Sequence, residues 1–167
     1  MAATHQYFSP ILENRSMPPG SIIPELGYHD LRAAVGWLCN VFGFRDRMRI
    51  GNHRVQLLVG QASIVAYALP AEESAVNETV EQVALPPPRT LGLTLRQTFG
   101  LMVRVADVDA HHQFVEQRGA RILQPPENFP FGERQYSVED IGGYRWTFSQ
   151  SIADADPAEW GGELLRE

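Results

Sequence analysis

The chain contains no lysine: all 14 of its basic residues are arginine. Without a side-chain amine it cannot form a Schiff base with a carbonyl substrate or with pyridoxal phosphate, and it cannot carry a P-loop lysine. It has one cysteine, Cys39, which excludes an internal disulfide and any CxxC site. Several large enzyme classes are therefore excluded before any motif is considered.

Positive charge and long apolar runs are also scarce. The 167 residues include 20 acidic and 14 basic side chains, a net charge of −6, and the basic residues form no cluster. This charge balance argues against binding to nucleic acid or to an anionic membrane surface. The longest apolar stretch, around Ile64 to Leu69, is too short to span a bilayer. The start of the chain does not resemble a signal peptide, so we expect a cytoplasmic location.

The first half of the sequence predicts one βαβββ module over residues 21–69. Residues 1–20 form an irregular arm that ends in Pro-Pro-Gly. Asp30 is typical of a helix N-cap and Gly43 of a helix end, with apolar residues at helical spacing between them. Strands are expected at 21–28, 44–50, 54–59 and 63–69.

The same order recurs over residues 100–150. A strand at 101–105 is followed by a helix that begins at Asp107 or Asp109 and ends near Gly119. Strands follow at 121–123, 135–138 and 144–149, with a loop around Pro125, Pro126 and Pro130. Residues 70–99 form a linker with a possible acidic helix, and residues 151–167 a tail that Trp160 docks on the body or on a partner. The predicted fold class is α+β, a duplication of βαβββ modules.

The residues from the first cap onward, DLRAAVGWLCNVFGF, resemble the first-helix signature of the vicinal oxygen chelate superfamily. This superfamily contains the glyoxalase, bleomycin-resistance and extradiol-dioxygenase relatives. The segment VRVADVDAHHQFVEQRGARILQPPENFPFGERQYSVEDIGGYRWTFSQS resembles the C-terminal module of its glyoxalase-like subgroup that lacks a recognised enzyme signature. The resemblance implies paired modules that form a curved mixed-sheet cradle, with helices outside and the ligand on the concave face. It also implies a homodimer.

The resemblance further implies where a divalent metal would be held. The first metal ligand of each module lies seven residues before the helix cap, at Ile23 and Gly100, and the last-strand positions are Thr147 and about Ala66, or Val65. None of these side chains is the His, Gln or Glu that the enzymes use. A catalytic metal needs about three converging protein ligands. We therefore predict no cofactor. A divalent metal held by ligands at other positions of the sequence stays an alternative.

Alternation along the strands selects the candidate ligand-binding residues. Those expected on the concave face are Glu25, His29, Met102, Arg104, Arg145 and Thr147. Glu25 and Arg104 either anchor a polar ligand from opposite walls or form a salt bridge with each other. Glu25 and His29 lie four strand residues apart, about 13 Å, too far to share one metal ion.

Other reactive residue types favour structural roles. Adjacent helical residues point about 100° apart, so His111 and His112 do not converge on a metal. Cys39 has no evident basic partner, and Asp140 is typical of a turn. No catalytic residue is identified, although Glu25, His29 or His53 would be the candidate base of a metal-free enzyme.

Three functional hypotheses remain. The leading one is a metal-free protein similar to the bleomycin-resistance members, which sequesters a small amphipathic drug or metabolite in its groove. The second is a lyase, isomerase or dioxygenase of the same superfamily, with or without metal. The third is a non-catalytic interaction scaffold that acts through its arm and tail.

Overall fold

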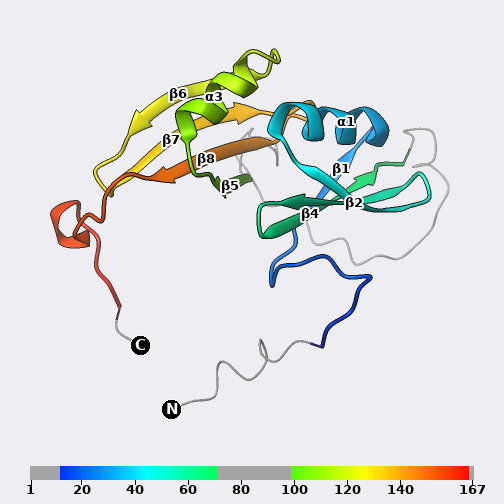
Figure 1. The fold of residues 1–167 in the computed structure, drawn as a ribbon, viewed down its shortest axis with the longest axis horizontal. Helices are drawn as coiled ribbons and strands as arrows, with labels where there is room; N and C mark the ends of the chain where they lie inside the picture. The colour runs from blue at the N-terminus through cyan, green and yellow to red at the C-terminus, as the bar shows by residue number, and fades with distance from the viewer. Residues whose placement is uncertain (1–11, 71–98, 166–167) are drawn as a thin grey trace, which may run out of the picture. The chain divides into compact units, whose positions relative to one another are not determined.

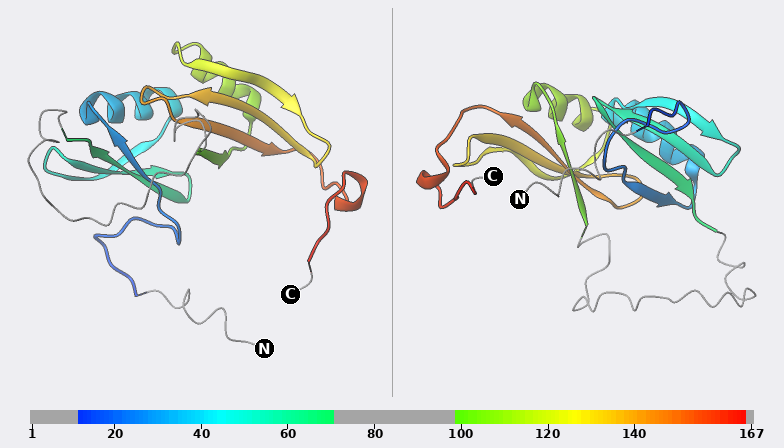
Figure 2. Two further views of the ribbon diagram at one scale, coloured as in Figure 1. Left: turned by 180° about the vertical axis from the view of Figure 1, so that it is seen from behind. Right: turned by 90° about the horizontal axis from the view of Figure 1, so that it is seen from below.

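The computed structural model describes residues 12–70 and 99–165. The chain divides into two compact units, Met1–Ala75 and Val76–Glu167, which we call module 1 and module 2. Each contains one four-stranded mixed sheet and a helix packed on one of its faces (Figures 1 and 2). The predicted α+β fold of two βαβββ modules is therefore confirmed. The linker helix expected within residues 70–99 lies largely outside the described residues.

Module 1 follows the predicted order of elements. These are β1 (Glu25–Tyr28), α1 (Leu31–Phe42), β2 (Arg45–Ile50), β3 (Arg54–Val59) and β4 (Ala62–Ala68). The strands lie in the order β1-β4-β3-β2, with β1 parallel to β4 and the other pairs antiparallel. Strand β1 starts directly after Pro24 and lies at the sheet edge, where a missing amide donor is tolerated.

Helix α1 has the predicted ends. The carboxylate of Asp30 accepts a 2.9 Å hydrogen bond from the amide of Ala33, and Gly43 adopts the left-handed conformation with φ of 75°. Both features satisfy backbone groups that the helix leaves unpaired at its ends. The buried stripe of α1 consists of Leu31, Ala34, Val35, Leu38, Val41 and Phe42. It packs on the sheet face that carries Leu26, Leu57 and Ala66.

Module 2 repeats this arrangement. Its elements are β5 (Gly100–Arg104), α3 (Val108–Glu116), β6 (Arg121–Asn128), β7 (Glu133–Glu139), β8 (Arg145–Ser151) and a short 3-10 turn η2 (Pro157–Glu159). The strands lie in the order β5-β8-β7-β6, and β5 is parallel to β8. Helix α3 packs on the face that carries Tyr136, Val138, Trp146 and Phe148.

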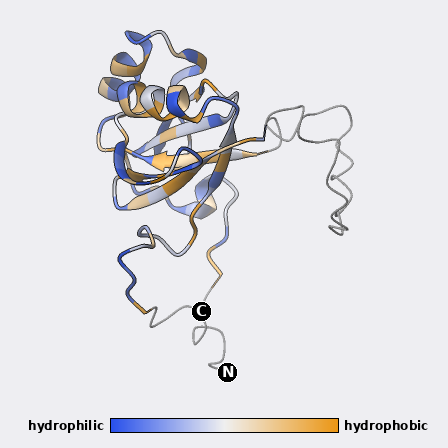
Figure 3. Cartoon of the chain, turned by 90° about the vertical axis from the view of Figure 1, so that its right-hand side faces the viewer, coloured by the Kyte–Doolittle hydropathy of each residue, from blue (hydrophilic) through white to orange (hydrophobic). Residues whose placement is uncertain are grey.

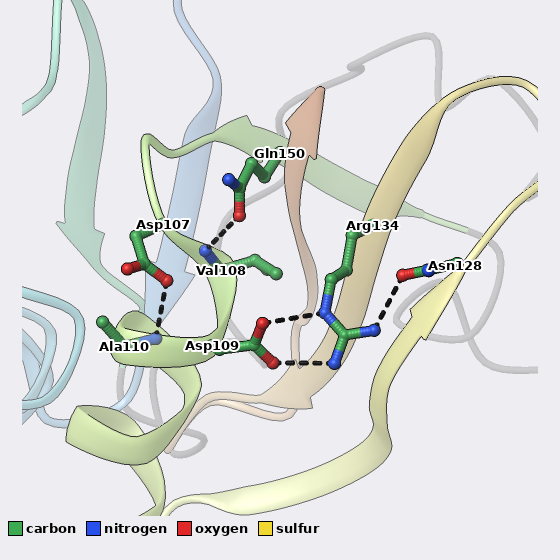
Figure 4. Close-up of polar contacts among 7 residues, drawn as sticks. All are labelled: Asp107, Val108, Asp109, Ala110, Asn128, Arg134 and Gln150. Carbon is green, nitrogen blue, oxygen red and sulfur yellow. Dashed lines mark hydrogen bonds and ion pairs between the residues drawn. The ribbon is translucent and has the colours of Figure 1, made fainter. Parts of the chain in front are cut away.

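The structure resolves which aspartate caps α3. Asp107 is the cap, because its carboxylate accepts a 2.9 Å hydrogen bond from the amide of Ala110. Asp109 instead receives two hydrogen bonds from Arg134 of β7, at 2.8 and 2.9 Å, and so ties the helix to the sheet (Figure 4). The helix ends at Glu116, and the left-handed residue Gly119 follows three positions later.

Two strands differ from the prediction. The strand expected at 21–28 begins only at Glu25, directly after Pro24. The expected strand at 121–123 continues to Asn128 through the two prolines that we assigned to a loop. Strand β6 is one of the two edge strands of its sheet and has register shifts between Ile122 and Gln124 and between Gln124 and Glu127. An edge position and a bulged register accommodate Pro125 and Pro126, because neither requires an amide donor at every residue.

Each sheet has one face covered by its own helix and an opposite face that we call the open face. Strands and helices carry both hydrophobic and hydrophilic stretches, as expected for elements with one buried side (Figure 3). None of the helices within residues 12–70 and 99–165 has the length and apolar character needed to cross a membrane.

Candidate functional site

The open face of module 2 brings four of the six predicted binding residues together. The register of β5 and β8 places Met102 opposite Thr147, and Gly100 opposite Arg145. Arg104 lies next along β5, opposite Ser149. Because the neighbouring residues Trp146 and Phe148 are buried against the helix side, the alternation directs this set to the open face.

A hydrogen-bond network lies at one end of this face. Glu133 of β7 accepts a 2.5 Å hydrogen bond from the hydroxyl of Ser149 and another from Ser151. Ser151 in turn accepts a 2.7 Å hydrogen bond from Arg104, and Ser149 accepts one of 3.0 Å from the amide of Gln135. The hydrogen bonds from Ser149 and Ser151, aided by the charge of Arg104, lower the pKa of the Glu133 carboxyl. This network keeps Glu133 ionised and orients Arg104.

A second, smaller group of polar contacts lies at the other end. Arg145 reaches the hydroxyl of Ser137 at 3.4 Å, and Ser137 and Thr147 share a hydrogen bond of 3.2 Å. The ion pairs formed by the described residues include neither Arg104 nor Arg145. Both guanidinium groups therefore retain donors for a ligand, since each has five N–H groups.

Between these ends lies one exposed apolar side chain. Met102 is 63% exposed and stands midway between the Arg145 and Arg104 levels of the strand pair. Four residues of strand separate those levels, about 13 Å at the usual rise. Gly100 adds no side chain beside Arg145: a Cβ there would have only the Arg145 carbonyl oxygen, at 3.8 Å, within contact range. We call these five residues (Gly100, Met102, Arg104, Arg145 and Thr147) the β5–β8 strip.

The other two predicted site residues lie in module 1 and have different surroundings. Glu25 of β1 forms an ion pair with Arg54 of β3. The two residues lie on the open face, and strand β4 separates their strands. Within their own modules, Glu25 contacts Arg54 and Arg104 contacts Ser151. The salt bridge considered between Glu25 and Arg104 stays a prediction. His29 is exposed in the bend between β1 and α1.

The residues at the expected metal-ligand positions do not fit a divalent metal. The strand register places Val65, opposite Glu25, on the open face, whereas Ala66 lies opposite Leu26 in the core. The remaining positions are Ile23, Gly100 and Thr147, of which only the threonine has a donor atom. Within the described part of the chain, no three His, Cys, Asp or Glu side chains come close enough to hold a metal ion. We therefore derive no chemistry through a metal.

Several reactive side chains prove to be structural. His111 forms a 2.7 Å hydrogen bond with the Tyr136 hydroxyl, and its ring centroid lies 4.3 Å from that of Phe148. Burial raises the pKa of Tyr136 well above its usual range. Burial, followed by the charge of Asp46, raises the pKa of Cys39. A raised pKa lowers the thiolate fraction, which disfavours a nucleophilic role.

The C-terminal tail docks on module 2. Trp160 packs edge-on against Phe131 with 5.7 Å between ring centroids, and Phe131 stacks on Phe129 at 5.2 Å. Phe129 and Phe131 thus form the docking site of the tail. Sequence reasoning missed Glu133, although the alternation of β7 around buried Tyr136 and Val138 directs it to the same face as Gln135 and Ser137.

Comparisons with known proteins agree with this architecture. The sequence model of the Glyoxalase/Bleomycin resistance protein/Dioxygenase superfamily matches residues 24–148. No curated protein matches the chain. Among solved structures, TioX from Micromonospora sp. ML1 is similar at 29% identity and a TM-score of 0.58, over 87% of this chain and 98% of that one.

More distant structures share the fold. A glyoxalase/bleomycin resistance protein/dioxygenase from Nocardioides has 16% identity and a TM-score of 0.56, over 96% of this chain and 95% of its own. Lactoylglutathione lyase from Agrobacterium tumefaciens has 20% identity and a TM-score of 0.53, over 80% of this chain and 96% of its own. At such identities the likeness concerns the fold alone, since one scaffold supports unrelated chemistries.

Proposed function

Because the chain belongs to the glyoxalase/bleomycin resistance protein/dioxygenase superfamily, we propose that it is a metal-free member that binds and sequesters a small amphipathic molecule. The ligand lies on the β5–β8 strip of module 2. Its apolar part covers Met102, and its hydrogen-bond acceptors or negative charge meet Arg104 and Arg145. The expected homodimer and cytoplasmic location belong to the same proposal.

The observation that carries the proposal is the pattern of the strip itself. An exposed methionine stands between two arginines whose hydrogen bonds go to hydroxyl groups rather than to carboxylates. Methionine adapts its shape to irregular apolar ligands. Arginine presents a planar set of donors that suits carboxylate, sulfonate or amide oxygens. A ligand about 10–13 Å long would reach both arginines, given the strand rise between them.

The network behind Arg104 supports binding rather than catalysis. Glu133 is held by two serine hydroxyls and has a lowered pKa, so it is a poor proton acceptor near neutral pH. Its negative charge orients Arg104 through Ser151. Glu25, the one carboxylate considered as a base from the sequence, is engaged by Arg54. Both acidic groups thus position arginines, which is what a binding surface requires.

The test uses tag-free full-length protein dialysed against a chelator. Two probes are titrated by calorimetry and by thermal unfolding: metal-free bleomycin, for the family, and 1-anilinonaphthalene-8-sulfonate, an anionic aromatic amphiphile. Saturable stabilisation is expected, about 2.7 kcal/mol at a hundredfold excess over Kd. The probes should be recovered chemically unchanged. Turnover of a probe would contradict the binding proposal and favour the enzyme hypothesis.

Paired variants locate the site. Arg104→Ala should weaken probe binding about tenfold, as expected for loss of a charge-assisted hydrogen bond. Arg118→Ala is the matched control, because Arg118 lies over the Phe114 ring of α3 on the covered side of the sheet. Equal affinities for the two variants would exclude the strip as the binding site. Unaltered protein that is stabilised by neither probe would instead favour the scaffold hypothesis.

Elemental analysis tests the metal-free part separately. The protein is reloaded with manganese, iron, nickel and zinc, dialysed again, and analysed. We expect metal well below one ion per chain. Stoichiometric metal retained by the folded protein would contradict this part of the proposal and place displaced ligands in the site.

A further inference from the structure

On module 1, the sheet face opposite the helix carries a segment of the same chain. The described part of the arm, residues 12–20, runs along the side of the sheet opposite α1 (Figure 1, the blue segment before β1), and from here on the arm means these residues. Three of its backbone carbonyls, from Arg15, Ser16 and Pro19, accept hydrogen bonds from side chains of the sheet. The arm is thus held by its main chain.

The three donors lie on three adjacent strands. Arg47 of β2 donates to Arg15 at 2.8 Å, and Gln56 of β3 donates to Ser16 at 2.9 Å. Ser63 of β4 donates to the carbonyl of Pro19. The arm therefore crosses β2, β3 and β4 in their order in the sheet before it continues to β1.

The donors are arranged as a built site rather than as loose surface groups. Gln56 and Ser63 are only 4% and 2% exposed, and buried polar groups need partners. The Gln56 oxygen accepts from Arg47, which orients its amide toward the arm. Arg47 is the extra residue of a register shift between Asp46 and Met48, and such bulges commonly re-aim a side chain.

The arm is complementary to these donors. Pro18 and Pro19 have carbonyl acceptors but no amide hydrogens. This part of the arm can therefore lie on the sheet without leaving a backbone N–H group unpaired. Pro18 is the buried residue of the arm, with exposed neighbours on both sides. Proline also restricts the free chain, which lowers the entropy lost on binding. A turn held by Asn14, which accepts from the amides of Ser16 and Met17, shapes the preceding residues.

The contact is limited in extent. The arm itself lines most of an open hollow of about 570 Å³, to which the sheet contributes Arg47. Most arm side chains are exposed, Leu12 at 92%. A segment held by three hydrogen bonds and one buried proline is at the low end of local stability, where segments open without global unfolding.

We infer that the open face of module 1 is a binding site for the backbone of an extended peptide, and that the arm of the same chain occupies it as a tethered, displaceable occupant. The site binds successive backbone carbonyl oxygens of the peptide through hydrogen bonds from Arg47, Gln56 and Ser63. Residues 12–20 fill it by virtue of their high effective concentration. Ligands offering the same row of carbonyls compete with the arm.

Cleavage of the full-length protein by trypsin at the Arg15–Ser16 bond, followed by intact mass, measures how often the arm opens. Arg47→Ala and Ser63→Ala should each raise the initial cleavage rate about tenfold, since each removes an anchor. Arg49→Ala is the matched control, because this arginine of the same strand binds Asp46 instead. Rates equal to that of the unaltered protein in both anchor variants, with retained thermal stability, would overturn the inference.

Dilution distinguishes an arm bound within one chain from one exchanged between copies. The cleavage rate per molecule should stay constant over about a hundredfold dilution, because intramolecular binding does not depend on concentration. Loss of protection on dilution would place the arm on a second copy and overturn the tethered assignment.

A competition experiment tests the peptide site directly. Residues 12–19 of the full chain are exchanged for a Gly-Ser sequence of equal length, and a fluorescein-labelled peptide, LENRSMPPGS, is added. Fluorescence anisotropy should show saturable binding to the exchanged chain and about tenfold weaker binding to the unaltered chain. The same peptide with both prolines replaced by alanine should bind more weakly. Equal binding of the first peptide to both chains, or binding to neither, would overturn the inference.

Discussion

The indole nitrogen of Trp146 donates a 3.0 Å hydrogen bond to the carboxylate of Asp140, and both residues are buried. The other carboxylate oxygen of Asp140 accepts from the backbone amides of Gly142 and Tyr144, at 2.8 and 2.9 Å. The Asp140 side chain thus closes the turn between β7 and β8 and accepts the indole N–H hydrogen bond of Trp146, the largest core residue of module 2.

Replacing Asp140 should therefore destabilise the protein strongly. Asp140→Ala leaves one buried and two part-buried donors without this acceptor, and we expect a loss of about 2–4 kcal/mol in the free energy of unfolding. Urea denaturation followed by tryptophan fluorescence measures it. Asp154→Ala, at an exposed position of the tail, is the control and should change stability by less than about 0.5 kcal/mol. A loss for Asp140→Ala no larger than this control would contradict the assigned role.

Glu133 should make stability depend on pH in the acidic range. Its pKa is lowered from the ordinary value of 4.5 by the hydrogen bonds from Ser149 and Ser151. The folded state therefore favours the ionised form, and this contribution is fully present above pH 4.5 and lost as the pH falls through the lowered folded-state pKa. Thermal unfolding at a series of pH values should show a shallower acid slope for Glu133→Gln than for the unaltered protein. Glu116→Gln, on the exposed side of α3, should keep the original slope.

The two helix caps should contribute to stability without affecting binding. Asp30→Ala and Asp107→Ala each remove a side-chain acceptor at 2.9 Å from a first-turn amide, at a cost of about 1 kcal/mol. Asp30→Ser and Asp107→Ser, which retain a capping oxygen, should recover most of it. Denaturant unfolding and probe titration give the two readouts. A changed probe affinity in either alanine variant would show that the aspartate does more than cap its helix.

Filling the space at Gly100 should block the strip at little cost to folding. Gly100 does not adopt a left-handed conformation, and its added Cβ would make only an ordinary contact with the Arg145 carbonyl. Gly100→Phe should therefore weaken probe binding about tenfold and change stability by about 0.5 kcal/mol or less. Gly36→Phe is the control, because Gly36 lies on the exposed side of α1 with open space around it. Equal probe affinity in both variants would place the ligand elsewhere.

Much of the fold was predictable because its signals are local. The caps at Asp30 and Asp107, the left-handed Gly43 and the turn glycines Gly51 and Gly60 all act through their own or neighbouring backbone. Alternation likewise placed Arg104, Arg145 and Thr147 on one face. The prolines of β6 misled the prediction because their effect depends on strand order, and only an edge strand accepts them without losing ladder bonds.

The site was less predictable because partners are chosen by register. Whether Val65 or Ala66 lies on the open face of module 1 changes with a shift of one residue, and the pairing of Glu25 with Val65 places Val65 there. The ion pair of Glu25 with Arg54 and the anchoring of the arm by Gln56 join residues 29 and 40 positions apart. Such contacts carry no local sequence signal.

Pro125 and Pro126 also affect how molecules of this protein meet one another. An exposed edge strand offers unpaired amide and carbonyl groups to which a strand of another molecule can add. Along β6 two consecutive residues have no amide to offer, and the bulged register interrupts the remaining ones. This edge is therefore a poor template for growth of the sheet, and the two prolines protect the folded protein against edge-to-edge aggregation at high concentration.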